Sequence, residues 1–455
     1  MNFHTINPAT EEIIKTYEEE AIDSLDKKLI NSEKTFHEWK NTAFAERAAL
    51  MKTAGCVLRD NKGVYAGLMA IEMGKPLAQG IAEVEKCAWV CDYYAENAEA
   101  FLSDNIISTE AQKSYAAFLP LGSVLAIMPW NFPFWQVFRF AAPAIMAGNT
   151  GILKHARNTM GCAAAIEDVF RKAGFPEGVF ANLVIGSGMV EGIIRHDSIK
   201  AVTLTGSTPV GAQVAAAAGS ALKKTVLELG GSDPYVILAD ADIEKAARAC
   251  SAARLVNSGQ SCIAAKRFIV EKPVLARFEE AFTEEMNKAV MGNPLEQSTT
   301  IGPQARRDLQ LDLHRQVEQS LAKGAKLLLG GKIPDGKGFY YPPTVLTNVT
   351  KGMPACDEET FGPVAAIIEA TDENDAINKA NDTVFGLGAA VFTADSRKGD
   401  KIAKHKLNAG CCFVNDFVRS DPRLPFGGVR QSGFGRELGS YGIKEFVNIK
   451  TICVY

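Results

Sequence analysis

The feature that most constrains this chain is a regular alternation of short apolar runs with helix-length amphipathic stretches. In a first series, the apolar runs are residues 124–128, 151–154, 179–184, 201–205 and 225–229. Helical stretches such as 136–146 and 160–173 separate them, and a second series extends from residue 234 to about 416. Because short apolar strands that alternate with helices form parallel sheets buried on both faces, the sequence predicts an α/β protein with two such sheets.

The two ends of the chain differ from these series. Residues 7–100 have helical periodicity and are predicted to form several packed helices. Residues 445–452 have the composition of a strand, yet little chain follows to pair with them. This tail is therefore a candidate for adding to the sheet of another subunit.

Composition excludes several classes of protein. The 455 residues are 47% hydrophobic, which is enough for two or three domain cores, and the net charge of −4 comes from both signs spread along the chain. No basic block suggests nucleic acid, and no apolar run reaches the roughly 18 residues of a membrane helix. The ten cysteines are scattered without a C-x-x-C pair, and no two of the six histidines have ligand spacing. A cytoplasmic protein with reduced thiols and no metal site is expected.

One cysteine lies in a run of small and polar residues, Asn257-Ser258-Gly259-Gln260-Ser261-Cys262-Ile263-Ala264. A thiol in such a turn has no bulky neighbours, and backbone N–H groups there can favour the nucleophilic thiolate. An ordinary cysteine titrates near pH 8.5, so activation would need to supply only about 1.4 kcal/mol. The alternative for this stretch by itself is a buried, inert cysteine.

Polar residues occur where predicted strands end. Asn131, Lys154, Gly206, Ser207 and Glu228 all lie at or just beyond such ends, where ligands bind in parallel sheets. A glutamate on a buried strand has its pKa raised towards that of a general base, unless a salt bridge neutralises it. An asparagine beside the nucleophile can donate to an oxyanion, although turns also favour asparagine. The loop at residues 205–211 opens a helix where phosphates could bind, yet it is not a G-x-G-x-x-G turn.

Several stretches resemble signatures of the aldehyde dehydrogenase superfamily, in the family's order and over almost the whole chain. They are Glu72-Met73-Gly74-Lys75-Pro76, Pro129-Trp130-Asn131-Phe132-Pro133, Thr205-Gly206-Ser207, Glu228-Leu229-Gly230-Gly231, Gly259-Gln260-Ser261-Cys262, Glu359-Thr360-Phe361-Gly362-Pro363 and Pro425-Phe426-Gly427-Gly428. The resemblance implies a Rossmann-like NAD(P)-binding domain at 1–100 and 122–230 and a catalytic domain at 231–430. Residues 101–121 and 431–455 would form a small β oligomerisation element.

The resemblance also implies roles for single residues. Cys262 would attack the aldehyde, Asn131 and the Cys262 N–H would hold the oxyanion, and Glu228 would activate water to hydrolyse the thioester. The implied cofactor-binding residues are Met128, Trp130, Lys154, Arg157, Gly206, Ser207, Leu229, Glu359 and Phe361. Many NAD-preferring members carry an acidic residue at the position of Arg157. Because an arginine can attract a 2′-phosphate, we expect NADP to be accepted as well as NAD.

The predicted substrate site follows the oxyanion asparagine. Trp135 and Arg139 are one helical turn apart, and Arg139 lies eight residues after Asn131, so that one helix face could carry all three. An arginine beside an aromatic ring suggests an aldehyde with a distal carboxylate, and Ser261 and Ser420 are further candidates. This pattern is similar to that of the shorter bacterial succinate-semialdehyde dehydrogenases.

Other interpretations remain open from the sequence. The enzyme could oxidise a general aliphatic, phosphorylated or other semialdehyde substrate. A binding protein that has lost its chemistry, or a cysteine acyltransferase without redox chemistry, would share parts of the pattern. Oligomer size and any redox role of Cys87, Cys91, Cys411 and Cys412 are not determined by the sequence.

Overall fold

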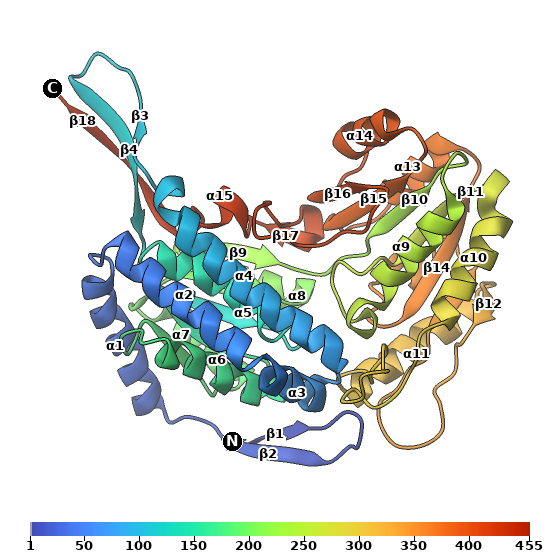
Figure 1. The fold of residues 1–455 in the computed structure, drawn as a ribbon, viewed down its shortest axis with the longest axis horizontal. Helices are drawn as coiled ribbons and strands as arrows, with labels where there is room; N and C mark the ends of the chain where they lie inside the picture. The colour runs from blue at the N-terminus through green and yellow to red at the C-terminus, as the bar shows by residue number, and fades with distance from the viewer. Residues whose placement is uncertain (1) are drawn as a thin grey trace.

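The first sheet-centred body is built on a six-stranded sheet in the order β17-β9-β8-β5-β6-β7 (Figure 1). The computed structural model describes residues 2–455. The parallel strands are β5 (Ser123–Met128), β6 (Thr150–His155), β7 (Phe180–Leu183), β8 (Ile199–Thr205) and β9 (Lys224–Glu228). These strands coincide with the five predicted apolar runs to within a residue or two, which confirms the first parallel sheet.

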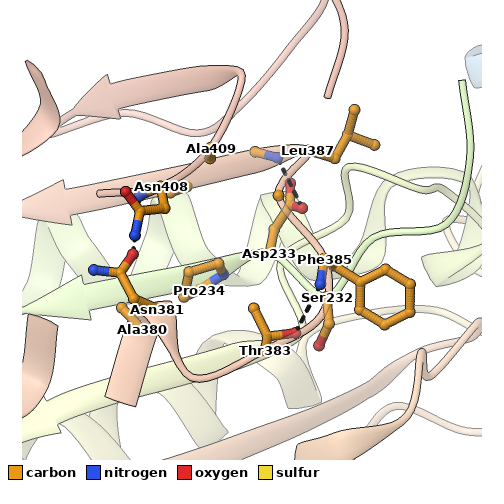
Figure 2. A pocket seen from close by; sticks show the side chains of 13 residues that line it. Ser232, Asp233, Pro234, Ala380, Asn381, Thr383, Phe385, Leu387, Asn408 and Ala409 are labelled. Atoms are coloured by element: carbon orange, nitrogen blue, oxygen red, sulfur yellow. Dashed lines mark hydrogen bonds between the residues drawn. The ribbon is translucent and has the colours of Figure 1, made fainter. Parts of the chain in front are cut away.

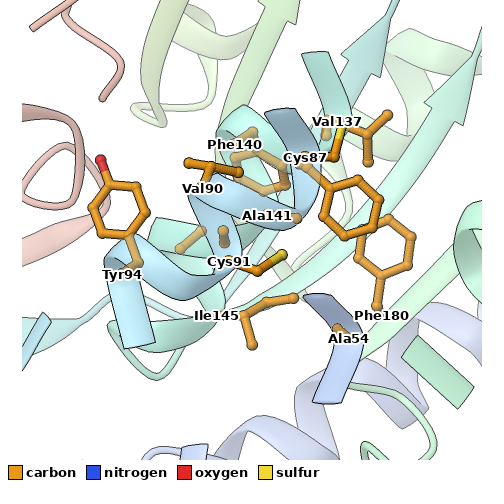
Figure 3. Close-up of a cluster of buried hydrophobic side chains, with 14 of the residues drawn as sticks. Ala54, Cys87, Val90, Cys91, Tyr94, Val137, Phe140, Ala141, Ile145 and Phe180 are labelled. Carbon is orange, nitrogen blue, oxygen red and sulfur yellow. The ribbon is translucent and has the colours of Figure 1, made fainter. Parts of the chain in front are cut away.

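Helices cover both faces of this sheet. They are α1 (Ile22–Trp39), α2 (Phe44–Asp60), α3 (Lys62–Met73), α4 (Leu77–Phe101), α5 (Trp135–Met146), α6 (Met160–Lys172), α7 (Val190–Arg195) and α8 (Thr208–Ser220). Successive side chains of β5 enter opposite cores: Val124 and Ala126 pack with α4 and α5, whereas Leu125 and Ile127 pack with α1 and α7. Figure 3 shows the first core, in which Cys87 and Cys91 lie among apolar side chains.

The second body is built on a seven-stranded sheet in the order β12-β13-β14-β11-β10-β15-β16. Its strands are β10 (Pro234–Ile237), β11 (Arg267–Glu271), β12 (Lys326–Leu329), β13 (Thr344–Thr347), β14 (Val364–Ala370), β15 (Gly388–Phe392) and β16 (Cys411–Val414). All neighbours are parallel except β12 and β13. The main helices around it are α9 (Ile243–Leu255), α10 (Leu275–Asn287), α11 (Arg307–Ala322), α13 (Glu373–Asn381) and α14 (Ser396–His405). The second predicted sheet is therefore also confirmed.

The chain crosses between the two bodies twice. It leaves the six-stranded sheet after β9 and enters the seven-stranded sheet at β10, and it returns after β16 along the upper side of Figure 1. The short strand β17 (Gly433–Phe434) then pairs antiparallel with β9, opposite Glu228 and Leu227. Residues 433–434 thus belong to the six-stranded sheet, although the sequence placed all of 431–455 in the oligomerisation element.

A three-stranded sheet of β18 (Val447–Val454), β4 (Lys113–Pro120) and β3 (Asn105–Ile106) projects from the six-stranded body (Figure 1). β18 pairs with β4 along its whole length. The expectation that the tail has no partner in its own chain was wrong, because β4 supplies one. β18 is nevertheless an edge strand, since it pairs with β4 alone in the order of this sheet.

A hairpin of β1 (Asn2–Ile6) and β2 (Ile13–Glu18) was not predicted, because only helical periodicity was recognised before residue 100. Its turn reaches the second body, where Glu11 accepts from Arg307 at 2.8 Å and from the N–H of Gly338 at 2.9 Å. None of the helices formed by residues 2–455 combines the length and apolarity of a membrane span.

Candidate active site

A cavity of about 450 Å³ is lined by residues of α4, α5 and α9, the loop after α9, and the loop that returns from the second body. Cys262 lines it, and so do all four predicted substrate residues, Trp135, Arg139, Ser261 and Ser420. A second cavity, beside Ser232 and Asp233 (Figure 2), encloses only about 10 Å³. That is room for one water molecule at most, so only the larger cavity can admit an organic substrate beside the thiol.

The loop that carries Cys262 is held by an unusual backbone. Asn257 and Ser258 have left-handed conformations, with φ of 52° and 56°. The ammonium of Lys266 donates hydrogen bonds to three carbonyl groups of the loop, those of Ser261 at 3.1 Å, Cys262 at 2.7 Å and Ala264 at 3.2 Å. The N–H of Cys262 donates to no acceptor within the described chain, residues 2–455. This N–H is therefore free to bind a substrate oxygen.

The turn around Cys262 does not favour a thiolate. Burial raises the pKa of this thiol to about 12, and the positive charges of Arg139 and Lys266 offset the effect of burial only in part. Two sources of activation were open from the sequence, the turn or helix end and a nearby glutamate that acts as a base. Desolvation disfavours the charged form more than the nearby cations favour it, which leaves a base as the means of activation. A base must therefore take the proton when the sulfur attacks.

Asn131 lies in the bend before α5, which begins at Trp135. The expectation that it shares a helix face with Arg139 was therefore wrong. Its amide is oriented by two neighbours: Gln136 donates to its Oδ1 at 3.1 Å, and its own Nδ2 donates to the carbonyl of Gln260 at 3.1 Å. Because a carboxamide has two N–H donors, the second remains for a ligand. The bend thus brings a donor to the loop of the nucleophile.

A buried carboxylate fixes the start of α5. Glu83 accepts from the N–H groups of Phe134 and Trp135, both at 2.9 Å, and forms an ion pair with buried Lys75. The Lys75 ammonium also lies 3.8 Å from the ring centroid of Phe132. Free N–H groups at a helix start need such an acceptor. Glu83 and Lys75 therefore hold the segment that carries Asn131.

Glu228, the last residue of β9, is buried, and neither of its carboxylate oxygens has a hydrogen-bond partner among residues 2–455. Burial raises its pKa well above the ordinary value. The charge of Glu437 raises it further, and Arg139 opposes both effects. The alternative of a neutralising salt bridge fails within the described chain. An unpaired carboxyl with a raised pKa near a thiol has the properties of a general base.

Arg139 is buried and already has protein partners. It forms an ion pair with Glu437 and donates from Nη2 to Thr205 Oγ1 at 3.3 Å. Its guanidinium carbon also lies 4.9 Å from the ring centroid of Phe426. A guanidinium has five N–H donors, so these contacts leave donors for a ligand in the cavity. Because Glu437 already neutralises its charge, however, Arg139 is not a free cation for a ligand.

The predicted cofactor residues lie at the carboxyl edge of the six-stranded sheet. Met128 ends β5, Lys154 is in β6, and Gly206 and Ser207 lead into α8, where Ser207 is the N-cap. Gly206 donates to the carbonyl of Glu228 at 3.0 Å, and Leu229 donates to that of Ser432 at 3.0 Å. These positions are where parallel sheets bind nucleotides.

Charges at this edge fit a dinucleotide. Burial lowers the pKa of Lys154, and the charge of Arg157 lowers it further, so two cations lie close together. Arg157 is exposed and has no ion pair within residues 2–455. On the opposite side, Glu359 accepts from the N–H of Gly231 at 2.9 Å. The side chain of Trp130 packs edge-on against Phe361, with ring centroids 5.7 Å apart.

Several site residues were missed by the sequence reasoning. They are Lys266, Glu437, Glu83 and Lys86, isolated charges in unremarkable stretches. The fold buries the first three and brings Glu83 and Lys86 to the cavity lining. The one available signal was the spacing of Glu83 and Lys86, which puts both on one face of α4.

The site combines the thiol of Cys262 in the cavity, the oriented carboxamide of Asn131 and the unpaired carboxyl of Glu228. These groups lie between the two sheets, near the edge of the six-stranded sheet where a nucleotide could bind. This is the arrangement of an aldehyde-oxidising enzyme with covalent cysteine chemistry. The chain belongs to the aldehyde dehydrogenase family, whose model matches residues 1–452.

Similar proteins agree in their names. The chain is 47% identical over 454 residues to a probable succinate-semialdehyde dehydrogenase [NADP(+)] of Synechocystis sp., with 100% of each chain covered. It is 47% identical over 448 residues to a succinate semialdehyde dehydrogenase [NAD(P)+] of Escherichia coli, covering 98% of this chain and 97% of the relative. A solved succinic semialdehyde dehydrogenase of Streptococcus pyogenes, in complex with NADP+, superposes with a TM-score of 0.97 at 36% identity, with 99% of each chain covered.

Proposed function

We propose that the protein oxidises succinate semialdehyde to succinate with NADP+ or NAD+ as the oxidant. The observation that carries this proposal is the cavity that places a thiol and a buried arginine, Cys262 and Arg139, along one lining. A short chain with an aldehyde at one end and a carboxylate at the other matches that pair. The names of the relatives support the same substrate.

In the first step, the Cys262 sulfur adds to the aldehyde carbon and forms a thiohemiacetal. The carbonyl oxygen gains negative charge, and the N–H of Cys262 and the second N–H of the Asn131 amide, both without an acceptor among residues 2–455, would hold it. The thiol proton must leave, because the pKa of Cys262 is about 12. We assign this proton to solvent water in the cavity, so that Glu228 remains available for the hydrolysis step.

In the second half of the reaction, a thioester forms on Cys262 and Glu228 promotes its hydrolysis. A nicotinamide held at the edge of the six-stranded sheet would accept the hydride that the thiohemiacetal loses when it becomes a thioester on Cys262. Glu228 then takes a proton from water as the water oxygen bonds to the thioester carbon. The carbon–sulfur bond breaks, the acid leaves, and the sulfur recovers a proton.

We propose that NADP is accepted through Arg157. Lys154 and Glu359 would bind ribose hydroxyls, and Arg157, a cation without an ion pair within residues 2–455, would bind a 2′-phosphate beside Lys154. Arg157→Glu should lower kcat/KM for NADP+ by about 10-fold or more, since it replaces a charge-assisted contact with repulsion. Steady-state kinetics with both cofactors checks this. A strong NAD preference in the parent enzyme that the variant leaves unchanged would contradict it.

The substrate is tested by comparing aldehydes of matched length. Succinate semialdehyde should have a kcat/KM about 100-fold or more above that of butanal, because only the former has a carboxylate for the cavity cations. Glutarate semialdehyde and glyceraldehyde 3-phosphate complete the set. Equal rates with butanal would instead support a general aliphatic aldehyde dehydrogenase.

We further propose that the three-stranded sheet joins subunits into a homodimer or homotetramer. β18 is an edge strand with exposed Ile449, and Ile106 on β3, the opposite edge strand, is exposed as well. Edge strands with apolar side chains are usually covered by another strand or subunit. Light scattering of the purified protein tests this assembly.

We also propose the domain limits and the location of the protein. The cofactor domain comprises residues 1–100 and 122–230, and the catalytic domain comprises residues 231–430. Residues 101–121 and 431–455, apart from β17, form the element that joins subunits. The ten cysteines, all of which are free thiols, support a cytoplasmic location.

A further inference from the structure

A second cation lines the cavity, on α4. The ammonium of Lys86 donates to the hydroxyl of Ser420 at 2.8 Å and lies 4.4 Å from the ring centroid of Trp135. The indole N–H of Trp135 donates to the same hydroxyl at 3.1 Å. All three side chains line the cavity that contains Cys262. Lys86, Trp135 and Ser420 thus form a polar cluster, which we call the Lys86 cluster.

Lys86 has no ion pair within residues 2–455, and the carboxylates nearest to it have other partners. Asp421 pairs with Arg423 at 2.7 Å. Glu83 is occupied by Lys75 and by two backbone N–H groups. An ammonium has three donors, and the serine hydroxyl uses one. Two donors of a largely desolvated cation are therefore unused.

Lys86 differs in this from Arg139, the other cation of the cavity. Arg139 is paired with the buried carboxylate of Glu437, whereas Lys86 has no ion pair within residues 2–455 and only the more distant charges of Asp421 and Glu83 favour its charged form. A cation that is withdrawn from water and unpaired is costly unless a ligand supplies the opposite charge. Lys86 is thus the cavity group whose electrostatics a bound anion would improve most.

We propose that Lys86, together with the hydroxyl of Ser420, binds the distal carboxylate of the substrate and determines specificity for acidic aldehydes. Arg139 would approach the same carboxylate from α5 while Lys86 approaches from α4. This inference rests on the proposed function, because it names the group that selects the substrate class of that same site.

The charges around Lys86 predict that KM for succinate semialdehyde depends on pH, which gives a second test. Burial lowers the pKa of Lys86 to about 8, Arg139 on α5 lowers it further, and Asp421 and Glu83 raise it. Below pH 8 the ammonium is charged and can bind a carboxylate. Above that pH it loses its proton, so KM for succinate semialdehyde should rise with pH while KM for butanal should not.

The test compares Lys86→Met, Lys86→Arg and the control Lys52→Met with both aldehydes. Lys52 lies on α2 with half of its side chain exposed, 3.7 Å from Glu96, outside the cavity lining. Lys86→Met should raise KM for succinate semialdehyde about 10- to 100-fold and leave kcat/KM for butanal within about twofold. Lys86→Arg should recover part of the loss, and the rise of KM with pH should disappear in Lys86→Met.

The outcomes separate this inference from the proposed function. If the parent enzyme does not prefer succinate semialdehyde over butanal, the proposed function fails. If the parent prefers it and Lys86→Met leaves the preference intact, the role of Lys86 is overturned. An equal loss with both aldehydes would show a structural role instead and would also overturn the inference. Thermal melting of each variant shows whether it is folded, and Lys86→Met should melt no lower than the parent because it removes an unpaired buried charge.

Discussion

A buried glutamate lies at the start of α5 and another at the carboxyl end of β9, and the two differ in their hydrogen-bond partners. Glu83 is 4% exposed and has two backbone N–H donors and a lysine ammonium as partners. Glu228 is 2% exposed, and within residues 2–455 neither of its oxygens has a hydrogen-bond partner. Burial alone therefore does not distinguish the two residues, whereas their hydrogen-bond partners do.

The difference shows how one protein uses the same side chain for structure and for chemistry. A fully partnered carboxylate fixes the backbone around it, as Glu83 does for the segment that carries Asn131. An unpartnered one has a raised pKa and can take up and release a proton near neutral pH. Its desolvation is a local cost to stability, which the proposed role of Glu228 as a base would explain.

The largest effect should come from Glu228→Gln. Removal of the base should lower kcat by roughly 10²- to 10⁴-fold, because general base catalysis contributes on that scale. The first turnover should still release about one equivalent of reduced cofactor, because the block falls at thioester hydrolysis. Stopped-flow absorbance measures both phases. A steady rate near that of the parent, without a burst, would show that another group acts as the base.

Glu83→Gln should have the contrasting effect. It leaves Lys75 as an unpaired buried charge, so the free energy of unfolding should fall by about 3–5 kcal/mol. Glu85→Gln is the matched control, because Glu85 is on the same helix but is 39% exposed in its ion pair with Lys62. It should change stability by less than about 1 kcal/mol. Denaturant titration compares both with Glu228→Gln, and a Glu83 effect no larger than the Glu228 effect would break the comparison.

Stability should depend on pH through Glu228. Its pKa is raised in the folded protein, so its contribution is fully present below the unfolded pKa near 4.5 and is lost as pH rises through the folded pKa. The parent should therefore lose stability relative to Glu228→Gln as pH increases across this window. Melting curves at several pH values measure the difference. A difference that does not change with pH would mean that the carboxyl titrates as an ordinary exposed glutamate.

The smallest effect should be that of Glu437→Gln on the pH profile. Glu437 raises the pKa of Glu228, and it also pairs with Arg139, whose charge lowers that pKa. Removal of the Glu437 charge lowers the pKa of Glu228 directly, and it also lowers that pKa by leaving the Arg139 charge unopposed. The acidic limb of the pH profile of kcat should therefore move to lower pH. A pH–rate profile of the variant tests this, and a shift to higher pH would contradict the assignment of Glu228 to that limb.

Much of the fold was predictable because parallel strands buried on both faces are short apolar runs, as in residues 124–128 and 201–205. β13 was missed because its four residues, Thr344–Thr347, include two threonines and follow a loop with no helical stretch before it. β17 was missed because two residues carry no periodic signal.

The site was predictable to the extent that its residues belong to local motifs. Cys262, Asn131 and Glu228 stand in recognisable stretches, and the structure brings Cys262 together with Trp135, Arg139, Ser261 and Ser420 in one cavity. The raised pKa of the Cys262 thiol and the pairing of Arg139 with Glu437 were not predictable. Both depend on burial and on contacts between residues far apart in the chain, which no local pattern encodes.

The central claim is that Cys262 carries the acyl group and that Glu228 releases it. Its most direct test is peptide mass spectrometry of Glu228→Gln after mixing with succinate semialdehyde and NADP+. The account predicts one succinyl group on the peptide that contains Cys262, and none when Cys262→Ala is added to the variant. An unmodified Cys262 peptide in protein that has completed its first turnover, or a succinyl group on another residue, would contradict it.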